Sequence, residues 1–149
     1  EEALAVADRV GVMSVGRLEQ LAAPAELYSA PVTPFVADFV GLTNRIRGNI
    51  DGGRAHLLGG SVPLLPGSAP GPSALVLVRP EGVHIAHDGA GTASVVSASF
   101  LGGHGRVITR MSDGTLVTVQ VPNTQVTTFR PGDPVTLSPR GDAALAVAD

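Results

Sequence analysis

The sequence predicts a mainly β protein built from antiparallel strands, with a short α/β segment ahead of them. Two observations lead to this fold class. From Arg45 onward the chain consists of short apolar or alternating runs separated by glycine-containing turns, a pattern typical of strands and hairpins. Before Arg45, apolar residues recur at helical spacing and prolines stand where helices begin. We therefore expect two parts, residues 1–45 and residues 46–149.

The first residues have the pattern of one face of a helix. Ala3, Val6, Ala7 and Val10 recur at the i, i+3, i+4, i+7 spacing of a buried stripe. No Ser, Thr, Asp or Asn precedes the stripe to cap the free N–H groups of a first turn. We therefore expect the sequence to be a piece of a longer protein.

A strand hairpin and a first short helix are predicted next. The two strands are VGVMSV and LEQL, joined by a turn at 14–17. Pro24 suits the first position of a helix running to about Ser29, because its missing N–H would have no partner there. Ala23 precedes this helix, so we expect it to begin without a side-chain cap.

A second short helix is predicted after Thr33, which is a good N-cap residue followed by Pro34. Its apolar side consists of Phe35, Val36, Phe39 and Val40. We expect it to stop at Gly41, a residue suited to a left-handed C-terminal cap. The apolar side needs another surface to pack against.

Ten strands are predicted in the rest of the chain, over residues 46–51, 54–58, 61–65, 74–78, 83–87, 92–100, 106–111, 115–121, 134–138 and 143–147. Turns at 51–53, 88–91, 102–105 and 112–114 each offer the glycine that a turn with positive φ requires. Many short strands with few residues between them favour an antiparallel barrel or sandwich of the OB type.

Composition narrows the class of protein. With 149 residues and 44% hydrophobic content, the chain is large enough for a core of about one domain. It has no apolar stretch long enough for a membrane span and no cysteine for disulfides or thiolate metal sites, so we expect a soluble protein. All ten basic residues are arginine. Without lysine, no complete nucleotide-binding P-loop lies within these residues.

Nucleic acid is not expected as a partner. Residues 46–149 carry seven acids and seven arginines, so no excess of positive charge is available to neutralise a phosphate backbone. The five aromatic side chains are Tyr28, Phe35, Phe39, Phe100 and Phe129, which is few for stacking on bases.

No catalytic, cofactor or metal site is predicted. His84 and His87 would point to opposite faces of a strand, so their imidazoles would not converge on a metal. The glycines at 102–105 precede a strand rather than a helix, which favours a hairpin over a phosphate cradle. No Gly-x-Ser-x-Gly elbow is present. We interpret the adhesion-like tripeptide at 140–142 as a coincidence of letters.

The sequence Arg79-Pro80-Glu81 directly follows an apolar strand. Pro80 ends the hydrogen-bond ladder and sets a turn. The flanking opposite charges have two interpretations: a salt bridge at the strand end, which we prefer, or a regulatory contact across an interface.

Together these segments resemble the end of the ATPase subunit of a bacterial ABC importer. Residues 1–41 are similar to the stretch after that family's switch histidine, with Ala-Asp-Arg, a methionine strand, Gly-Arg-Leu-Glu-Gln, Pro-x-Glu-x-Tyr and Phe-Val-Ala-x-Phe-Val-Gly in order. Arg79–Glu81, Phe100–Gly102 and Asp113–Gly114 resemble the family's accessory TOBE domain, an OB-like module.

The resemblance implies a scaffold and regulator rather than a catalyst. The full-length parent would use ATP and Mg²⁺, but the Walker and signature motifs are absent from these residues, so we expect neither ATPase activity nor a bound cofactor here. Implied partners are a second copy, joined through residues 46–149, the importer's permease subunits, and a small solute or regulatory protein. The implied location is the cytoplasmic side of the cell membrane, as a peripheral subunit.

The resemblance also suggests contact residues and cargo. Candidates for regulatory or dimer contacts are Arg79, Glu81, Phe100, Leu101 and Gly102. Asn44 with Arg45 and the sequences VRPEGV and VPNTQ favour a polyamine importer, ahead of ferric iron and sugar. A free-standing OB-fold ligand-binding module is the alternative, and it leaves residues 1–41 unexplained.

Overall fold

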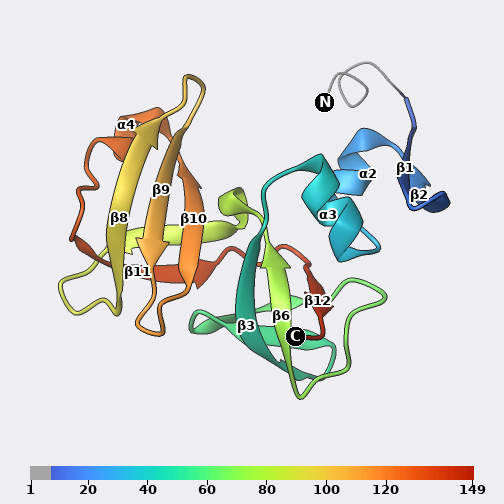
Figure 1. Cartoon of the computed structure of the whole chain (residues 1–149). Helices are drawn as coiled ribbons and strands as arrows, with labels where there is room; N and C mark the ends of the chain where they lie inside the picture. The colour runs from blue at the N-terminus through green and yellow to red at the C-terminus, as the bar shows by residue number, and fades with distance from the viewer. Residues whose placement is uncertain (1–7) are drawn as a thin grey trace.

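The computed structural model describes residues 8–149, which form an N-terminal segment and two antiparallel sheets (Figure 1). The N-terminal segment contains a hairpin of strands β1 (Val10–Ser14) and β2 (Arg17–Ala22), followed by helices α2 (Pro24–Ser29) and α3 (Pro34–Val40). One face of the hairpin packs on the helices through a small core that consists of Val10, Val12, Ala22, Leu27 and Val36. The predicted hairpin and both predicted helices are confirmed.

The predicted helix starts are also confirmed. The Thr33 hydroxyl accepts a hydrogen bond from the Val36 N–H at 3.2 Å, which caps α3. The α2 helix begins after Ala23 without a side-chain cap.

The predictions for Val10 and Gly41 in the N-terminal segment were wrong. Val10, assigned to a helical stripe, is the first residue of β1, while Ala3, Val6 and Ala7 lie outside the described residues. Gly41 has a φ of 169°, which is extended backbone and not the left-handed cap predicted. The carbonyl groups at this helix end have a different partner, described below.

The rest of the chain contains the ten predicted strands, arranged in two five-stranded sheets. The first sheet has the order β12-β6-β3-β4-β5 and the second β10-β9-β8-β11-β7. The strands are β3 (Asn44–Asp51), β4 (Arg54–Leu57), β5 (Gly60–Pro63), β6 (Ser73–Val78), β7 (Val83–His87), β8 (Ala93–Phe100), β9 (Gly105–Arg110), β10 (Leu116–Val121), β11 (Pro134–Pro139) and β12 (Leu145–Val147). The sheets are antiparallel throughout, which confirms the mainly β, OB-like class.

Two short elements were not predicted. A single 3₁₀ turn, η1 (Pro80–Gly82), connects the first sheet to the second, and helix α4 (Asn123–Val126) follows β10. Three of the predicted turns contain a glycine with positive φ, but the turn at 88–91 does not. There the Asp88 carboxylate accepts a hydrogen bond from the Ala90 N–H. Gly91 is needed for space, since a Cβ on it would lie 2.3 Å from the Val135 carbonyl oxygen.

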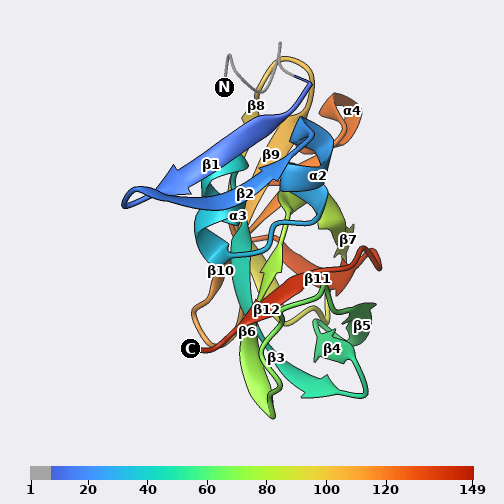
Figure 2. The ribbon, with the colours of Figure 1, turned by 90° about the vertical axis from the view of Figure 1, so that its right-hand side faces the viewer.

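One hydrophobic core joins the two sheets. It contains Ile46 and Val76 from the first sheet and Val107, Val117 and Val135 from the second, all almost fully buried. The buried amide of Asn44 adds a polar connection, because it both donates to and accepts from the backbone of Thr118 at 2.8 Å. We therefore treat the two sheets as one β domain, which Figure 2 shows from the side.

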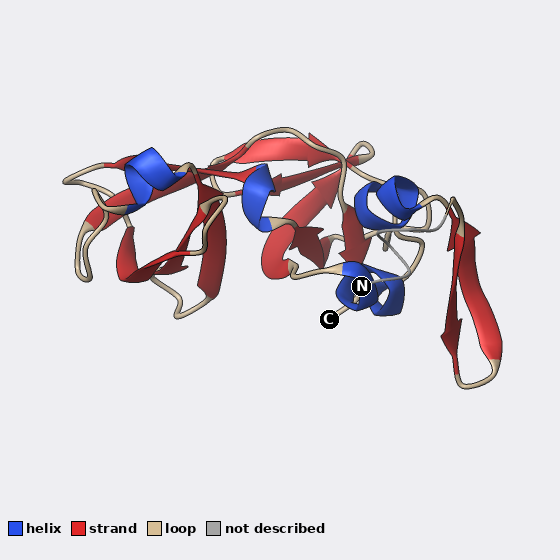
Figure 3. Cartoon of the chain, turned by 90° about the horizontal axis from the view of Figure 1, so that it is seen from above, coloured by secondary structure: helices blue, strands red, loops and turns tan. Residues whose placement is uncertain are grey.

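The described part of the molecule is elongated. The β1–β2 hairpin lies at one end and strands β8–β10 with α4 lie at the other, with α2 and α3 next to the first sheet (Figures 1 and 3). Among residues 8–149, no helix has the length and apolar character needed to cross a bilayer.

Candidate functional site

Arg79, at the end of β6, connects the β domain to both helices of the N-terminal segment. Its Nη1 donates to the carbonyl oxygens of Ala37, Gly41 and Leu42 at 3.0, 3.1 and 3.1 Å, and its Nη2 donates to that of Tyr28 at 3.1 Å. Such carbonyls at a helix C-terminus have no partner within the helix and carry partial negative charge. The guanidinium of Arg79 thus provides the C-terminal cap that was expected from Gly41.

Tyr28 of α2 completes this junction. The Arg79 guanidinium carbon lies 4.1 Å from the centroid of the Tyr28 ring, a cation–π distance. The Tyr28 hydroxyl donates a hydrogen bond to the Glu81 carboxylate. Burial, and then the hydrogen bond and negative charge of Glu81, raise the pKa of Tyr28 to about 12. The phenol is therefore neutral, and a donor, at physiological pH.

The guanidinium of Arg79 is partly buried but keeps its positive charge. Desolvation lowers the pKa of Arg79, and the neighbouring Tyr28, Glu81 and Asp38 act in the opposite direction. An arginine in this setting stays protonated. Arg79 and Glu81 thus both contact the N-terminal segment, across an interface within the chain. Within residues 8–149 they form no salt bridge with each other, so the salt bridge that we preferred from the sequence is wrong.

A cavity of about 310 Å³ lies at the same junction. Its walls come from α2, α3, β5, the end of β6 with η1, and the segment before β12. The lining residues are Tyr28, Ser29, Pro31, Ala37, Thr43, Val62, Leu65, Leu77, Val78, Arg79, Glu81, Gly82, Asp142, Ala143, Ala144 and Leu145. Most of this lining is apolar, and its charged members are Arg79, Glu81 and Asp142.

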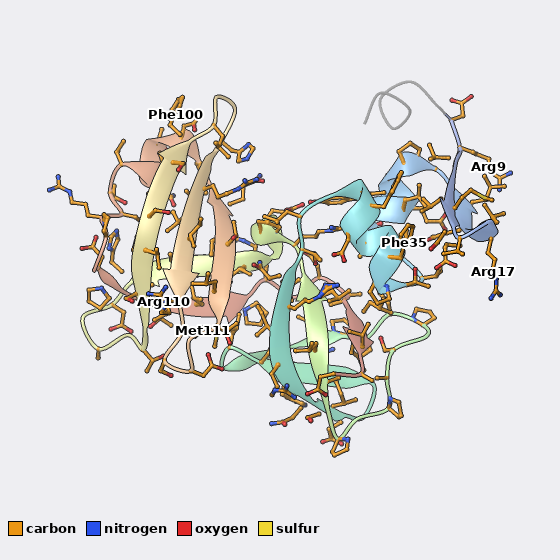
Figure 4. All side chains as sticks on the ribbon, in the orientation of Figure 1. Arg9, Arg17, Phe35, Phe100, Arg110 and Met111 are labelled. Atoms are coloured by element: carbon orange, nitrogen blue, oxygen red, sulfur yellow. The ribbon has the colours of Figure 1, made fainter. Side chains whose placement is uncertain are left out.

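The other predicted contact residues lie elsewhere. Phe100 is the last residue of β8, and Leu101 and Gly102 begin the turn to β9, at the end of the molecule away from α3 (Figure 4). Phe100 is 65% exposed and Leu101 44%. The Gly102 carbonyl accepts a hydrogen bond from the Asn123 side chain of α4, which holds the turn against the sheet. The structure therefore does not bring this turn together with Arg79 and Glu81.

The histidines predicted on β7 are both exposed. His87 stacks on Phe129 with ring centroids 4.3 Å apart, and its Nε2 lies 3.2 Å from the Thr128 hydroxyl. Within residues 8–149 no cluster of three or more His, Cys, Asp or Glu side chains has the geometry to hold a metal ion.

The N-terminal segment exposes large apolar side chains on the hairpin, which sequence reasoning missed, and on α3, where it had identified an apolar side in need of a partner surface. Met13, Leu18 and Leu21 are exposed on the face of the hairpin turned away from the helices. On α3, Phe35 and Phe39 are also exposed, with ring centroids 6.4 Å apart (Figure 4 labels Phe35). Two signals in the sequence could have indicated these exposed side chains. In a strand, Gly11 and Met13 lie on the same face, and in a helix the spacing of Phe35 and Phe39 places them on the same side.

This chain is similar to one domain family and to several import ATP-binding proteins. Residues 76–147 match the TOBE domain family. An Fe(3+) ions import ATP-binding protein of Rhodococcus jostii (strain RHA1) is 37% identical over 146 residues, which covers 95% of this chain and 42% of that protein. A spermidine/putrescine import ATP-binding protein of Pseudomonas aeruginosa is 34% identical over 160 residues, covering 100% of this chain and 43% of that protein.

A third kind of relative matches a shorter region. A sulfate/thiosulfate import ATP-binding protein of Chromobacterium violaceum is 49% identical over 84 residues, 56% of this chain and 23% of that protein. The chain spans about two fifths of the length of the relatives that it matches along most of its own length. Residues 76–147 are thus similar to the TOBE domain family, and the chain as a whole is similar to part of the ATP-binding subunits of bacterial ABC importers.

Proposed function

We propose that this chain acts as the regulatory and dimerisation region of an ABC importer ATP-binding subunit. The observation that carries the proposal is the similarity to import ATP-binding proteins over 95% of the chain, which includes both the N-terminal segment and the β domain. A free-standing OB-fold module is the alternative from the sequence. It accounts for the β domain only.

In this proposal the junction around Arg79 transmits movement. The N-terminal segment would be the end of the nucleotide-binding domain, and its two helices are tied to the β domain by four hydrogen bonds from one guanidinium. When ATP binding or hydrolysis moves the nucleotide-binding domain, the β domain would follow as a body. Arg79 and Glu81 would thus be positioning residues within one subunit.

The exposed apolar surface of the N-terminal segment supports the same role. Large apolar side chains gathered on one surface generally mark an interface. We propose that the outer face of the β1–β2 hairpin, with Phe35 and Phe39, packs against the remainder of the nucleotide-binding domain. ATP, Mg²⁺ and the permease subunits would bind that larger protein, at the cytoplasmic side of the membrane.

Dimerisation would use the β domain, with the Phe100–Leu101 turn as a contact between copies. Light scattering on the 149-residue chain tests this, and we expect a concentration-dependent dimer. Phe100→Ser should shift the equilibrium toward monomer. Leu116→Ser is the matched control, because Leu116 is also exposed but lies at the opposite end of β9. A strict monomer at high concentration, or an equal effect of both variants, would contradict the proposal.

The chain alone should not hydrolyse ATP. It has no lysine to contact the β- and γ-phosphates, as a P-loop requires. Calorimetry with MgATP should give no binding heat, and tight binding would count against the proposed role. For the cargo of the parent, we propose ferric iron or a polyamine. These two classes are the ones that the sequence suggested and that relatives covering 93–100% of the chain carry in their names.

A further inference from the structure

We propose that the cavity at the junction is a binding site for a small organic cation with a short alkyl chain. At about 310 Å³ it is at the lower end of the size range of small-molecule sites. Segments that are far apart in the sequence build it, from Tyr28 in α2 to Leu145 in β12. The inference is independent of the proposed role in an importer.

The apolar part of the lining favours an alkyl chain. Ala37, Leu77 and Leu145 form a small buried cluster between α3 and the first sheet, and all three line the cavity. Val62 and Val78 extend this apolar surface. Burying methylene groups there removes apolar area from water on both sides, whereas a sugar or nucleotide would lose hydrogen bonds to water without replacement.

The charged part of the lining favours a cation. Arg79 already uses both N–H groups of Nη1 and one of Nη2 on four backbone carbonyls, which leaves two of its five N–H donors for an anion. Within residues 8–149, Glu81 accepts a hydrogen bond from the Tyr28 hydroxyl alone, and a carboxylate has room for further donors. Asp142 lines the cavity, and within residues 8–149 it has neither a hydrogen-bond nor an ion-pair partner.

The two carboxylates belong to one local site. A Cβ placed on Gly82, the neighbour of Glu81, would lie 3.8 Å from Asp142 Oδ2. The cavity lining thus includes two carboxylates and one guanidinium that already donates to four backbone carbonyls, and an ammonium group with its three donors suits this excess of acceptors. A bound alkylammonium would contact both the N-terminal segment and the β domain, and would favour the arrangement in which they are docked.

Isothermal titration calorimetry on the 149-residue chain tests the site with three probes of equal chain length. These are hexylammonium, 1-hexanol and hexanoate at neutral pH. We expect hexylammonium to bind about fivefold more tightly than 1-hexanol, as for a partly exposed ion pair, and hexanoate to bind more weakly than either. Equal affinity of all three, tighter binding of hexanoate, or no binding of any probe would overturn the proposal.

Two variants of cavity residues and one control variant test whether the probes bind in this cavity. Asp142→Asn should weaken hexylammonium binding about fivefold and leave 1-hexanol unchanged, while Asp51→Asn, at an exposed turn outside the cavity, should change neither. Ala143→Phe should fill the cavity and abolish binding of all probes. Asp142 and Ala143 are exposed, so circular dichroism should show both variants folded. Wild-type affinity in either variant would refute the assignment.

Discussion

Replacing Arg79 by methionine should release α2 and α3 from the β domain while the two sheets stay folded. Methionine keeps an unbranched apolar stem but removes every N–H donor of the guanidinium. Four carbonyl groups at the ends of the two helices then lose their partner. The shared core of the sheets does not include Arg79, so it should be unaffected.

The size of the effect follows from the contacts. Nη1 has two protons for three carbonyls, so the four contacts amount to about three independent hydrogen bonds, each worth about 1 kcal/mol net in a half-buried setting. The cation–π contact with Tyr28 adds about 0.5–1 kcal/mol. Since solvent replaces part of the loss, we expect α2 and α3 to open more easily by about 3 kcal/mol, a factor of roughly 100 in the opening equilibrium.

Native-state hydrogen exchange measures this local opening directly. Backbone amides of α2 and α3 should exchange roughly 100-fold faster in Arg79→Met, and amides of β9 and β10 should keep their rates. Arg110→Met is the matched control, since Arg110 is exposed and, within residues 8–149, makes no side-chain hydrogen bond or ion pair. Unchanged exchange in α2 and α3, or equal acceleration in the control, would show that Arg79 does not hold the junction.

Three further outcomes are expected. The pKa of Tyr28 is raised to about 12 in the folded state, so its stabilising contribution should be complete below pH 10 and lost toward pH 12, and Tyr28→Phe should remove this loss. Phenolate absorbance reports Tyr28 alone, since the chain has one tyrosine, no lysine and no cysteine. Thr33→Ala should cost about 1 kcal/mol in denaturant unfolding, and Thr33→Ser very little, because serine keeps the capping hydroxyl. Gly105→Ala should destabilise by about 2–3 kcal/mol, because its Cβ would lie 2.5 Å from Val126 Cβ, while Gly103→Ala, with open space around it, should be near neutral in thermal melts.

The strands and helix starts were predictable because their signals are local. Alternating burial along β10, for example, follows directly from the order of residues in LVTVQV. The Thr33 cap depends on a backbone N–H only three residues away. Helix α4 was missed because it has four residues and no capping side chain, so its sequence carries no start signal.

The junction could not be predicted because its contacts join distant parts of the chain. The carbonyls that Arg79 contacts lie 37 to 51 residues earlier in the sequence. Nothing near Arg79 shows that it, and not the conformation of Gly41, satisfies the end of α3. The amide of Asn44 is a similar case, since its backbone partner Thr118 is 74 residues away. Sequence reasoning identified Arg79 and Glu81 as candidates, but their partners required the fold.

The pairing of β12 with β6 affects how the protein is made. Leu145 of β12 is 2% exposed and pairs with Leu77 of β6 in the first sheet. The other four strands of this sheet end by residue 78. During synthesis, β3 to β6 leave the ribosome long before residues 145–147 are translated. Until then, β6 has an unpaired edge, and the apolar residues that Leu145 covers are exposed to solvent. Chaperones protect intermediates of this kind from aggregation.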